Sequence, residues 1–273
     1  MGDRMDLEAV RELAADTRRE VLKMVHRAKA SHVGSCFSIA DMLAVLYGHV
    51  MSVDPVHADR PDRDRLIVSK GHAAAAVYAG LANRGFFPRE WLDEYSVNGS
   101  LLTGHVSHAV PGVELSTGSL GHGLSVGAGL ALGARLQGAA WRSFVILSDG
   151  ECDEGSIWEA AMFAGHHQLT NLVALVDYNK IQSFGRVDEV LRLEPFADKW
   201  TSFGWQVTEV DGHDHTALAE ALADKGGDKP NLLLCHTVKG RGVSFMEDRL
   251  EWHYKSPNDE QLAQAIAEIG SVQ

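Results

Sequence analysis

The chain has 273 residues, of which 45% are hydrophobic, and a formal net charge of −12. That length and composition suffice for a full hydrophobic core, and the acidic balance gives no electrostatic footprint for nucleic acid or an anionic membrane. The charged start, MGDRMDLEAVRELAADTRRE, lacks the apolar core of a signal peptide, and no stretch reaches the roughly 18 apolar residues of a membrane span. Three cysteines without metal-type spacing favour a reduced, cytoplasmic setting.

Apolar periodicity and turn signals predict helices that alternate with short strands. Residues 6–30 carry apolar side chains near a helical period and predict an amphipathic helix. Ser38 with Asp41 predicts a capping-box-like start for a second helix, which runs to about Met51. Strands are predicted at 65–69, 144–147, 172–177, 205–210 and 232–237, and further helices at 72–84, 121–137, 156–168, 214–224 and 259–269. Gly85 fits the C-terminal stop of the third helix.

Strands that alternate with helices predict an α/β fold, a doubly wound and mainly parallel sheet with helices on both faces. The run KGGDKP at 225–230 indicates a surface turn, so we expect residues 1–273 to form a single domain. Two irregular stretches, 98–118 and 180–197, are long for a compact domain, and long loops are often functional.

Polar residues follow two of the predicted strands. Ser148, Asp149 and Gly150 come after FVIL, and Asn179 follows LVALVDY. Ligands of open α/β sheets bind at the carboxyl ends of strands, and carboxylate and amide oxygens suit Mg²⁺. Gly150 lets the backbone approach a diphosphate closely, and the helix from about Ser156 adds N-terminal amides. Each pair alone is typical of an ordinary turn, but together they predict a site for metal and diphosphate.

The run SDGECDEGSIWEAAMFAGHHQLTNLVALVDYNKIQ resembles the thiamine diphosphate motif of transketolases, which begins Gly-Asp-Gly and ends in Asn. Ser148 replaces the first glycine of that motif. Four further blocks resemble the family in the same order: ASHVGSCFSIADMLAVLY, RLIVSKGHAAAAVYAGLANRGFF, GHVSHAVPGVELSTGSLGHGLSVGAGLALG and HTVKGRGVSFMEDRLEWH. The resemblance spans about residues 20–257.

The resemblance implies transfer of a two-carbon ketol unit from a ketose to an aldose with thiamine diphosphate and Mg²⁺, or Ca²⁺ or Mn²⁺ in its place. It implies that Asp149 and Asn179 bind the metal by side chain and Ile181 by its carbonyl. The cofactor-binding residues that it implies are His72, Gly118, Ser119, Leu120, Asp149, Gly150, Glu154, Asn179 and Lys239. His32, His105 and His253 are implied to be catalytic, and histidine suits proton transfer because its pKa lies at about 6.5.

Other residues in these blocks keep alternatives open. Glu154 and Glu159 match carboxylates near the family's subunit interface, but helix capping or solvation would also account for them. His108 and His122 lie in matching blocks, although position 122 is often Gln in the family. Cys152 is expected to pack rather than react. The small-residue helix at 121–137 would admit a close partner helix, or it would pack within this chain.

Transketolases are more than twice this length, since they add a C-terminal domain and a pyrimidine-binding domain that supplies a Glu to the cofactor. This chain ends at Gln273 without a segment for that Glu. We therefore expect the N-terminal subunit of a split transketolase, active with a C-terminal subunit in a complex of two copies of each chain; a fragment is the alternative. Its substrates would be sugars or sugar phosphates.

Alternative interpretations differ in kind. One is another thiamine enzyme, 1-deoxyxylulose-5-phosphate synthase or the alpha subunit of a 2-oxo-acid dehydrogenase. Another is a non-catalytic scaffold or regulatory protein that retains the fold. The runs SKGHA, TGSLGHG and KGRG with EWH favour transketolase.

Overall fold

The computed structural model describes residues 4–223 and 227–271. Five strands form one sheet in the order β1-β2-β3-β5-β4, and every neighbouring pair is parallel. The strands are β1 (Arg65–Val68), β2 (Ser143–Ser148), β3 (Leu172–Tyr178), β4 (Gln206–Asp211) and β5 (Asn231–His236). All residues of β2 and β3 are buried, because helices cover the sheet from both sides.

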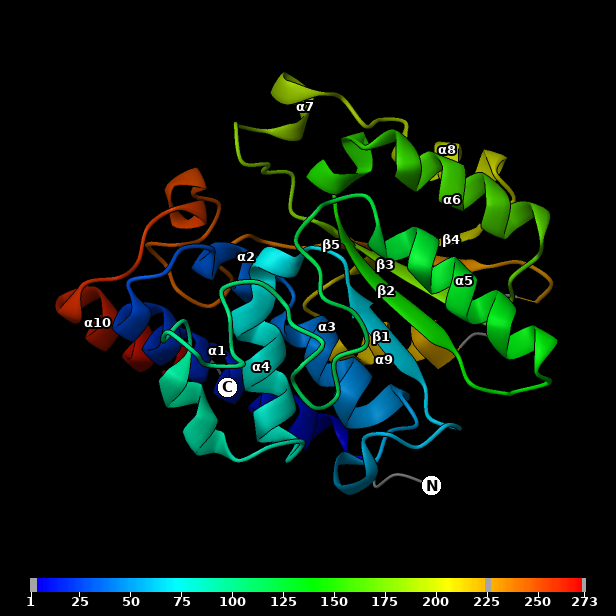
Figure 1. Cartoon of the computed structure of the whole chain (residues 1–273). Coiled ribbons are helices and arrows are strands. Elements are labelled where there is room, and N and C mark those ends of the chain that lie inside the picture. The colour runs from blue at the N-terminus through cyan, green and yellow to red at the C-terminus, as the bar shows by residue number, and fades with distance from the viewer. Residues whose placement is uncertain (1–3, 224–226, 272–273) are drawn as a thin grey trace.

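Helices form a layer on each face of the sheet (Figure 1). One layer contains α1 (Leu7–Ala28), α3 (Ala40–Val45), α4 (Ala74–Asn83) and α9 (His215–Ala223), with α10 (Asp259–Ser271) packed on α1. The other contains α5 (Gly123–Leu136), α6 (Gly155–His166) and α8 (Phe196–Ser202). Shorter helical segments are α2 (Val33–Ser38), α7 (Val187–Val190), η1 (Leu46–Val50), η2 (Pro55–His57), η3 (Gly71–Ala73), η4 (Arg89–Glu94), η5 (Gly150–Asp153) and η6 (Leu250–His253).

The sheet separates two hydrophobic cores. Phe144 and Ile146 of β2 belong to the core under α1, α3 and α4, whereas Val145 and Leu147 belong to the core under α5 and α6. Successive side chains of a strand point to opposite faces, so a strand buried on both faces is apolar throughout. The predicted doubly wound parallel fold is confirmed.

The predicted elements are largely confirmed. Each strand begins and ends within one residue of its predicted position. Gly85, the predicted helix stop, has a φ of 85°, the left-handed conformation that glycine adopts without strain. Within the predicted irregular stretch 180–197 the chain forms α7 and begins α8. Residues 224–226, at the end of one predicted helix and the start of the predicted surface turn, lie outside the described residues.

The capping box predicted at Ser38 is wrong. Helix α2 begins earlier, at Val33, and a break at Ile39 separates it from α3. The Ser38 hydroxyl donates to Asp177 at 2.7 Å, and Asp41 accepts N–H groups of Arg18. Both side chains are buried, so they are held by tertiary partners instead of capping a helix.

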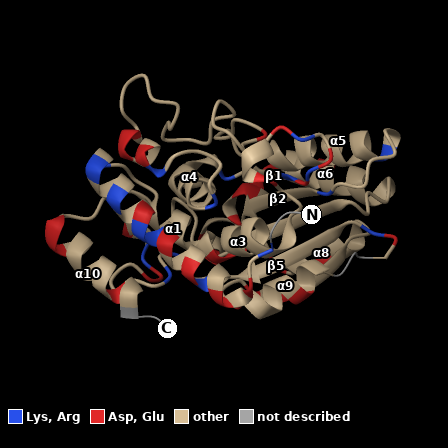
Figure 2. Ribbon diagram, turned by 90° about the horizontal axis from the view of Figure 1, so that it is seen from below, with Lys and Arg blue, Asp and Glu red and all other residues tan. Residues whose placement is uncertain are grey.

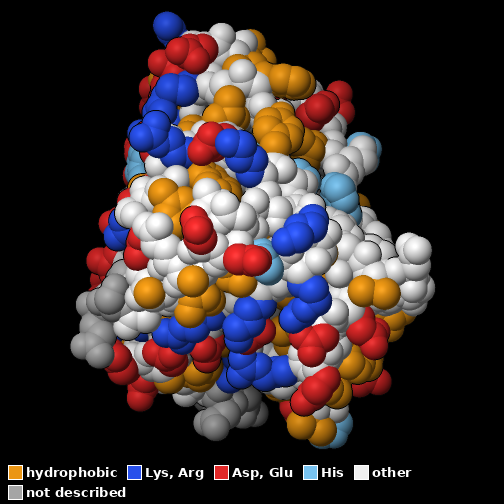
Figure 3. Space-filling model, turned by 90° about the vertical axis from the view of Figure 1, so that its left-hand side faces the viewer, with side chains coloured by type: hydrophobic (Ala, Val, Ile, Leu, Met, Phe, Trp, Pro, Cys, Tyr) orange, Lys and Arg blue, Asp and Glu red, His pale blue; other side chains and the backbone are white. Residues whose placement is uncertain are grey.

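Positions of charged residues are frequent along α1 (Figure 2). Helix α1 pairs Arg11 with Glu8 at 3.0 Å, and on the face drawn in Figure 3 acidic and basic side chains are interspersed. By contrast, the only Lys, Arg, Asp or Glu of α5 is Arg135, and that of α6 is Glu159. None of the described helices combines the length and apolarity needed to span a membrane.

Candidate active site

A pocket of about 470 Å³ opens at the carboxyl ends of β2 and β3. Residues from near both ends of the sequence and from the loops that follow the strands line this pocket. The predicted site residues that line it are His32, His72, His105, Gly118, Leu120, Asp149, Gly150, Glu154, Asn179, Ile181, Lys239 and His253. Ser119 does not line it and is exposed in the turn before α5.

Four imidazoles gather in this pocket. The ring centroid of His32 lies 5.0 Å from that of His253 and 5.1 Å from that of His72. The His105 ring is 6.2 Å from His32. Rings this close can hold a substrate's oxygens and move protons at several of them.

Hydrogen bonds hold the backbone of His32 and His105 and the ring of His72. His32 precedes α2 with a φ of 74°, and its backbone N–H donates to the carbonyl of His253 at 3.0 Å. The His72 Nε2 lies 2.9 Å from the Ser35 hydroxyl. The His105 carbonyl accepts a hydrogen bond from the Tyr78 hydroxyl at 2.8 Å, which leaves the ring free to face the pocket.

Burial keeps the imidazoles of His32, His72 and His253 neutral. Desolvation, with the charge of Lys239 nearby, lowers the pKa of His253 to about 3. Desolvation likewise lowers the pKa of His32 to about 4 and holds that of His72 below its usual value. Desolvation and the neighbouring Lys70 lower the pKa of Lys239 to about 8. A neutral imidazole has one donor and one acceptor nitrogen, so it can give or take a proton.

Three hard oxygens lie at the edge where β2 and β3 end. Asp149 accepts the N–H groups of Gly150 at 2.7 Å and Lys180 at 2.6 Å, and burial with the nearby Asp177 raises its pKa to about 6. The Asn179 amide donates to Asp177 at 2.9 Å, which directs its oxygen away from that carboxylate. The Ile181 carbonyl accepts from Lys239 at 2.9 Å.

These residues fit a divalent cation that carries a phosphate-bearing ligand. The described residues hold no group of three His, Cys, Asp or Glu that would bind a metal by themselves, so phosphate oxygens and water would complete the shell. Gln182 Nε2 and Asp153 Oδ1, both from the pocket lining, are buried without a hydrogen bond of normal geometry. Gly150 packs closely on this Gln182, since a Cβ there would lie 3.0 Å from its side chain.

The residues for which the sequence left more than one role open lie outside the pocket or at its rim. Glu154 is at the N-cap position of α6 but makes no capping hydrogen bond, so the capping alternative is wrong for it. Glu159, His108 and His122 are exposed, and none of them lines the pocket. Cys152 is fully buried and unpaired, and burial raises the pKa of its thiol, in line with a packing role.

Sequence reasoning missed the buried pair behind the metal ligands. Lys70 and Asp177 are fully buried and their charged atoms lie 2.5 Å apart. Asp177 also accepts from the Asn179 amide, so the pair orients a predicted metal ligand. The available signal was a charged residue at the carboxyl end of an otherwise apolar strand, as in LVALVDY and RLIVSK.

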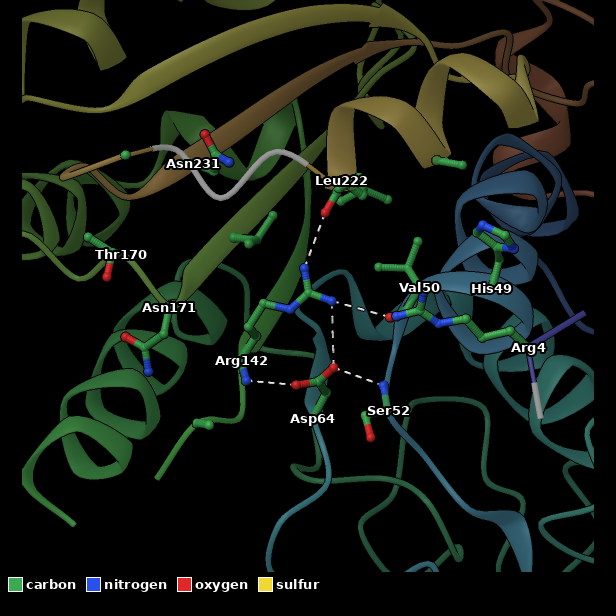
Figure 4. A pocket seen from close by; sticks show the side chains of 15 residues that line it. Arg4, His49, Val50, Ser52, Asp64, Arg142, Thr170, Asn171, Leu222 and Asn231 are labelled. Atoms are coloured by element: carbon green, nitrogen blue, oxygen red, sulfur yellow. Dashed lines mark hydrogen bonds and ion pairs between the residues drawn. The ribbon is translucent and has the colours of Figure 1, made fainter. Parts of the chain in front are cut away.

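A larger pocket, of about 640 Å³, lies at the opposite edge of the sheet (Figure 4). Its Arg142 guanidinium donates to the carbonyls of Leu222 at 3.1 Å and Val50 at 3.2 Å. Asp64 accepts the backbone N–H groups of Ser52 and Arg142. The bonds of Arg142 connect the segment before β2 with η1 and α9.

The family assignment follows from similar proteins. Residues 7–271 match the family described as "Transketolase, thiamine diphosphate binding domain". A protein of Phocaeicola vulgatus named as one subunit of apulose-4-phosphate transketolase is 41% identical over 97% of this chain and 95% of its own length. The "6-deoxy-6-sulfo-D-fructose transketolase subunit SqwG" of Clostridium sp. is also 41% identical, over 92% of this chain and 93% of its own. The chain belongs to the transketolase thiamine diphosphate-binding family.

Solved structures agree. Transketolase from Campylobacter jejuni superposes with a TM-score of 0.90 at 28% identity, over 97% of this chain and 43% of that one. The chain therefore spans less than half of that transketolase but nearly all of the relatives named as subunits. It is an N-terminal subunit of a transketolase-type enzyme, a thiamine diphosphate-dependent transferase, as the sequence predicted.

Proposed function

We propose that this chain binds thiamine diphosphate with Mg²⁺ and, together with a C-terminal subunit, transfers a two-carbon ketol unit from a ketose to an aldose. The observation that carries the proposal is the meeting of four histidines with Asp149 and Asn179 in one pocket. Ca²⁺ or Mn²⁺ would use the same oxygens. Residues 1–273 would form one cofactor-binding domain, in a cytoplasmic enzyme.

In this proposal the diphosphate end of the cofactor lies at the strand ends. Asp149, Asn179 and the Ile181 carbonyl hold the metal, which in turn holds the diphosphate. His72 and Lys239 face the diphosphate, and Glu154 lies at the rim. The turn of Gly118, Ser119 and Leu120 would present its backbone to the cofactor, and Gly118 packs closely on His105, because a Cβ there would lie only 3.0 Å from that ring. The bound cofactor supplies the nucleophile and the electron sink for carbon–carbon bond cleavage and formation.

The histidines act on the substrate's oxygens. His105 and His253 bind the donor's hydroxyl and carbonyl oxygens, with His32 between them. Because burial keeps His32 and His253 neutral, each ring has an acceptor nitrogen that can take a hydrogen bond from a substrate hydroxyl. The protein's contribution is to orient these oxygens and to move protons at them.

We propose that the partner covers the open face of α5 and α6. Large apolar side chains are exposed there: Leu136 at 79%, Met162 at 56% and Phe163 at 40%. A Cβ on Gly129 or Gly133 would meet no atom within 4 Å, so a partner helix can approach closely. The opposite face of α5 packs within the chain, where Leu124, Ala128 and Ala131 belong to the core. Exposed apolar surface of this kind is typical of an interface.

The substrate is a sugar or sugar phosphate in this proposal. The two relatives at 41% identity carry different sugars in their names, apulose 4-phosphate and 6-deoxy-6-sulfo-D-fructose. Because both relatives have the same sequence identity to this chain, the identity does not indicate which of the two sugars this chain would use. Residues of the partner subunit would contribute to that choice.

The test is to co-express a transketolase C-terminal subunit with this chain and to assay ketol transfer over a panel of ketoses and aldoses. Turnover that depends on thiamine diphosphate and Mg²⁺ supports the proposal, and Asp149→Ala should abolish metal-dependent cofactor binding in calorimetry. Decarboxylation of a 2-oxo acid, or condensation of pyruvate with glyceraldehyde 3-phosphate, would indicate one of the other thiamine enzymes. A complex that binds the cofactor without any turnover would indicate a scaffold.

A further inference from the structure

Glu151 is a fully buried carboxylate directly behind the pocket, and it is absent from the pocket lining. We propose that Glu151 is a positioning residue for the cofactor site. Its carboxylate accepts hydrogen bonds from three separate segments of the pocket wall and so holds them in place relative to one another. The inference rests on the cofactor binding proposed above. It concerns a residue that touches neither metal nor substrate and acts through its neighbours.

The Glu151 carboxylate accepts hydrogen bonds from three places in the sequence. One oxygen accepts the backbone N–H of Gly121 at 2.8 Å and the hydroxyl of Ser69. The other accepts the backbone N–H of Ser148 at 3.2 Å. These donors belong to the segment after β1, the turn before α5 and the end of β2.

Each donor is a close neighbour of residues that line the pocket. Ser69 precedes Lys70 and His72, Gly121 follows Leu120, and Ser148 precedes Asp149. A shift of the carboxylate would therefore move the segment of Lys70 and His72 and the turn that ends at Leu120 relative to Asp149. Misplacement of about 1 Å is enough to cost large factors in an enzyme site.

Ser69 extends the connection to α5. Its hydroxyl donates to Glu151 and accepts the backbone N–H of Gly123, the first residue of α5, at 3.0 Å. A Cβ on Gly123 would lie 2.3 Å from the Ser69 Oγ, so the helix start packs tightly on this serine. The start of the proposed partner-binding helix is thereby tied to the same carboxylate.

Ser148 and Glu151 form a reciprocal pair. The Ser148 hydroxyl accepts the backbone N–H of Glu151 at 3.3 Å, while the Glu151 carboxylate accepts the backbone N–H of Ser148. The same reciprocal pattern and Ser-x-x-Glu spacing, here in the run SDGE, occur in a capping box, although the N-cap of η5 is Asp149. The departure from Gly-Asp-Gly at position 148 thus has a structural consequence, because a glycine would lack the hydroxyl.

The charge state of the side chain matters to this role. A carboxylate only accepts, so it can receive all three donors at once. The isosteric Glu151→Gln substitution would direct an NH₂ group at one or more N–H or O–H donors and leave them unpaired. The wall segments would then separate although the side-chain volume is unchanged.

Asp64→Asn is a matched control. Asp64 is also buried and accepts the backbone N–H groups of Ser52 at 2.9 Å and Arg142 at 2.7 Å. It lies at the opposite edge of the sheet, in the pocket of Figure 4. Both substitutions replace a buried acceptor by an amide, but only one of them lies behind the cofactor site.

The experiment measures thermal midpoint, cofactor affinity by calorimetry and turnover for the assembled enzyme and both variants. We expect both variants to unfold at lower temperature, and only Glu151→Gln to raise the thiamine diphosphate Kd, by about tenfold, the effect of roughly one lost hydrogen bond to a charged group. Ser69→Ala, which removes a single donor, should raise the Kd in the same direction and serves if Glu151→Gln fails to fold.

Two outcomes separate the hypotheses. If the unmodified enzyme binds no thiamine diphosphate, the proposed function fails. If it binds the cofactor and Glu151→Gln or Ser69→Ala binds it equally well, with only the thermal midpoint lowered as in Asp64→Asn, then Glu151 is merely structural and this inference is overturned.

Discussion

The imidazoles are the main groups of the pocket that can exchange protons, and burial rather than pairing with acids keeps those of His32 and His253 neutral. His105 differs from the others because its backbone carbonyl, not its ring, makes the contacts that hold its segment. Removing the ring therefore leaves that loop anchored. This separation makes His105 a suitable residue for testing proton transfer.

We expect His105→Ala to lower kcat by about 10²–10⁴-fold, the usual contribution of one general acid–base group, with little change in cofactor affinity. Steady-state kinetics and calorimetry on the assembled enzyme measure the two effects. His108→Ala is the control, since His108 is exposed and outside the pocket, and it should stay within about twofold of the parent. An equally active His105→Ala variant would show that the ring is peripheral.

The depressed pKa of His32 also predicts a pH dependence of stability. Its pKa falls from the usual 6.5 to about 4 in the folded chain, so between these values the unfolded chain binds more protons. The free energy of unfolding should therefore decline as the pH falls from 6.5 towards 4, with a smaller decline for His32→Asn. Asn tolerates the left-handed backbone found at this position. Denaturant titrations at several pH values test this, and parallel curves for both proteins would contradict it.

Some helices and strands could be predicted from the local sequence, whereas the boundaries of others depend on tertiary contacts. Buried parallel strands such as LVALVDY were predictable because a short, continuous apolar run bounded by turns is typical of a strand covered on both faces. The start of α2 was not, since Ser38 and Asp41 imitate a capping box while the actual partner of Ser38, Asp177, is 139 residues away. Conversely, a true Ser-x-x-Glu pair at Ser148 and Glu151 was overlooked because it adjoins a strand end and a single helical turn.

The residues of the site also fall into those that local motifs predicted and those whose roles depend on distant partners. Motif resemblance predicted the residues that gather in the pocket, because the ends of parallel strands meet at one edge of a sheet. The residues behind them, Lys70, Asp177 and Glu151, could not be assigned, since their roles depend on partners distant in sequence. A charged residue beside an apolar strand indicates that a partner exists but not which one.

At α5 and α6 we expect an introduced charge to weaken association with the partner. Met162→Asp places a carboxylate where a side chain is now 56% exposed, so the fold should tolerate it, whereas an interface would bury it unpaired. We predict at least tenfold weaker binding, by about 1.4 kcal/mol or more, measured by sedimentation or titration with the C-terminal subunit. Val56→Asp, at 82% exposure on η2, is the control. Unchanged association for Met162→Asp would place the partner elsewhere.

The whole molecule presents its pocket and its apolar helices on neighbouring surfaces. Helix α6 begins directly after Glu154, and α5 begins shortly after Leu120, both of which line the pocket. A partner on these helices would thus stand next to the cofactor, and the two binding events should be coupled. Charged residues are few on these two helices, in contrast to α1 (Figure 2).

This coupling gives the last prediction, that thiamine diphosphate and the partner strengthen each other's binding. If the cofactor binds the assembled state only, a concentration one hundred times its Kd stabilises assembly by about 2.7 kcal/mol, which is about a hundredfold in the association constant. Titration of the C-terminal subunit with and without thiamine diphosphate and Mg²⁺ measures the shift. Asp149→Ala should remove the shift while leaving cofactor-free association intact, because Asp149 lies within the pocket and not on the open face of α5 or α6. The chain alone should show no ketol transfer, so robust turnover by this polypeptide without a second chain would refute the two-chain enzyme.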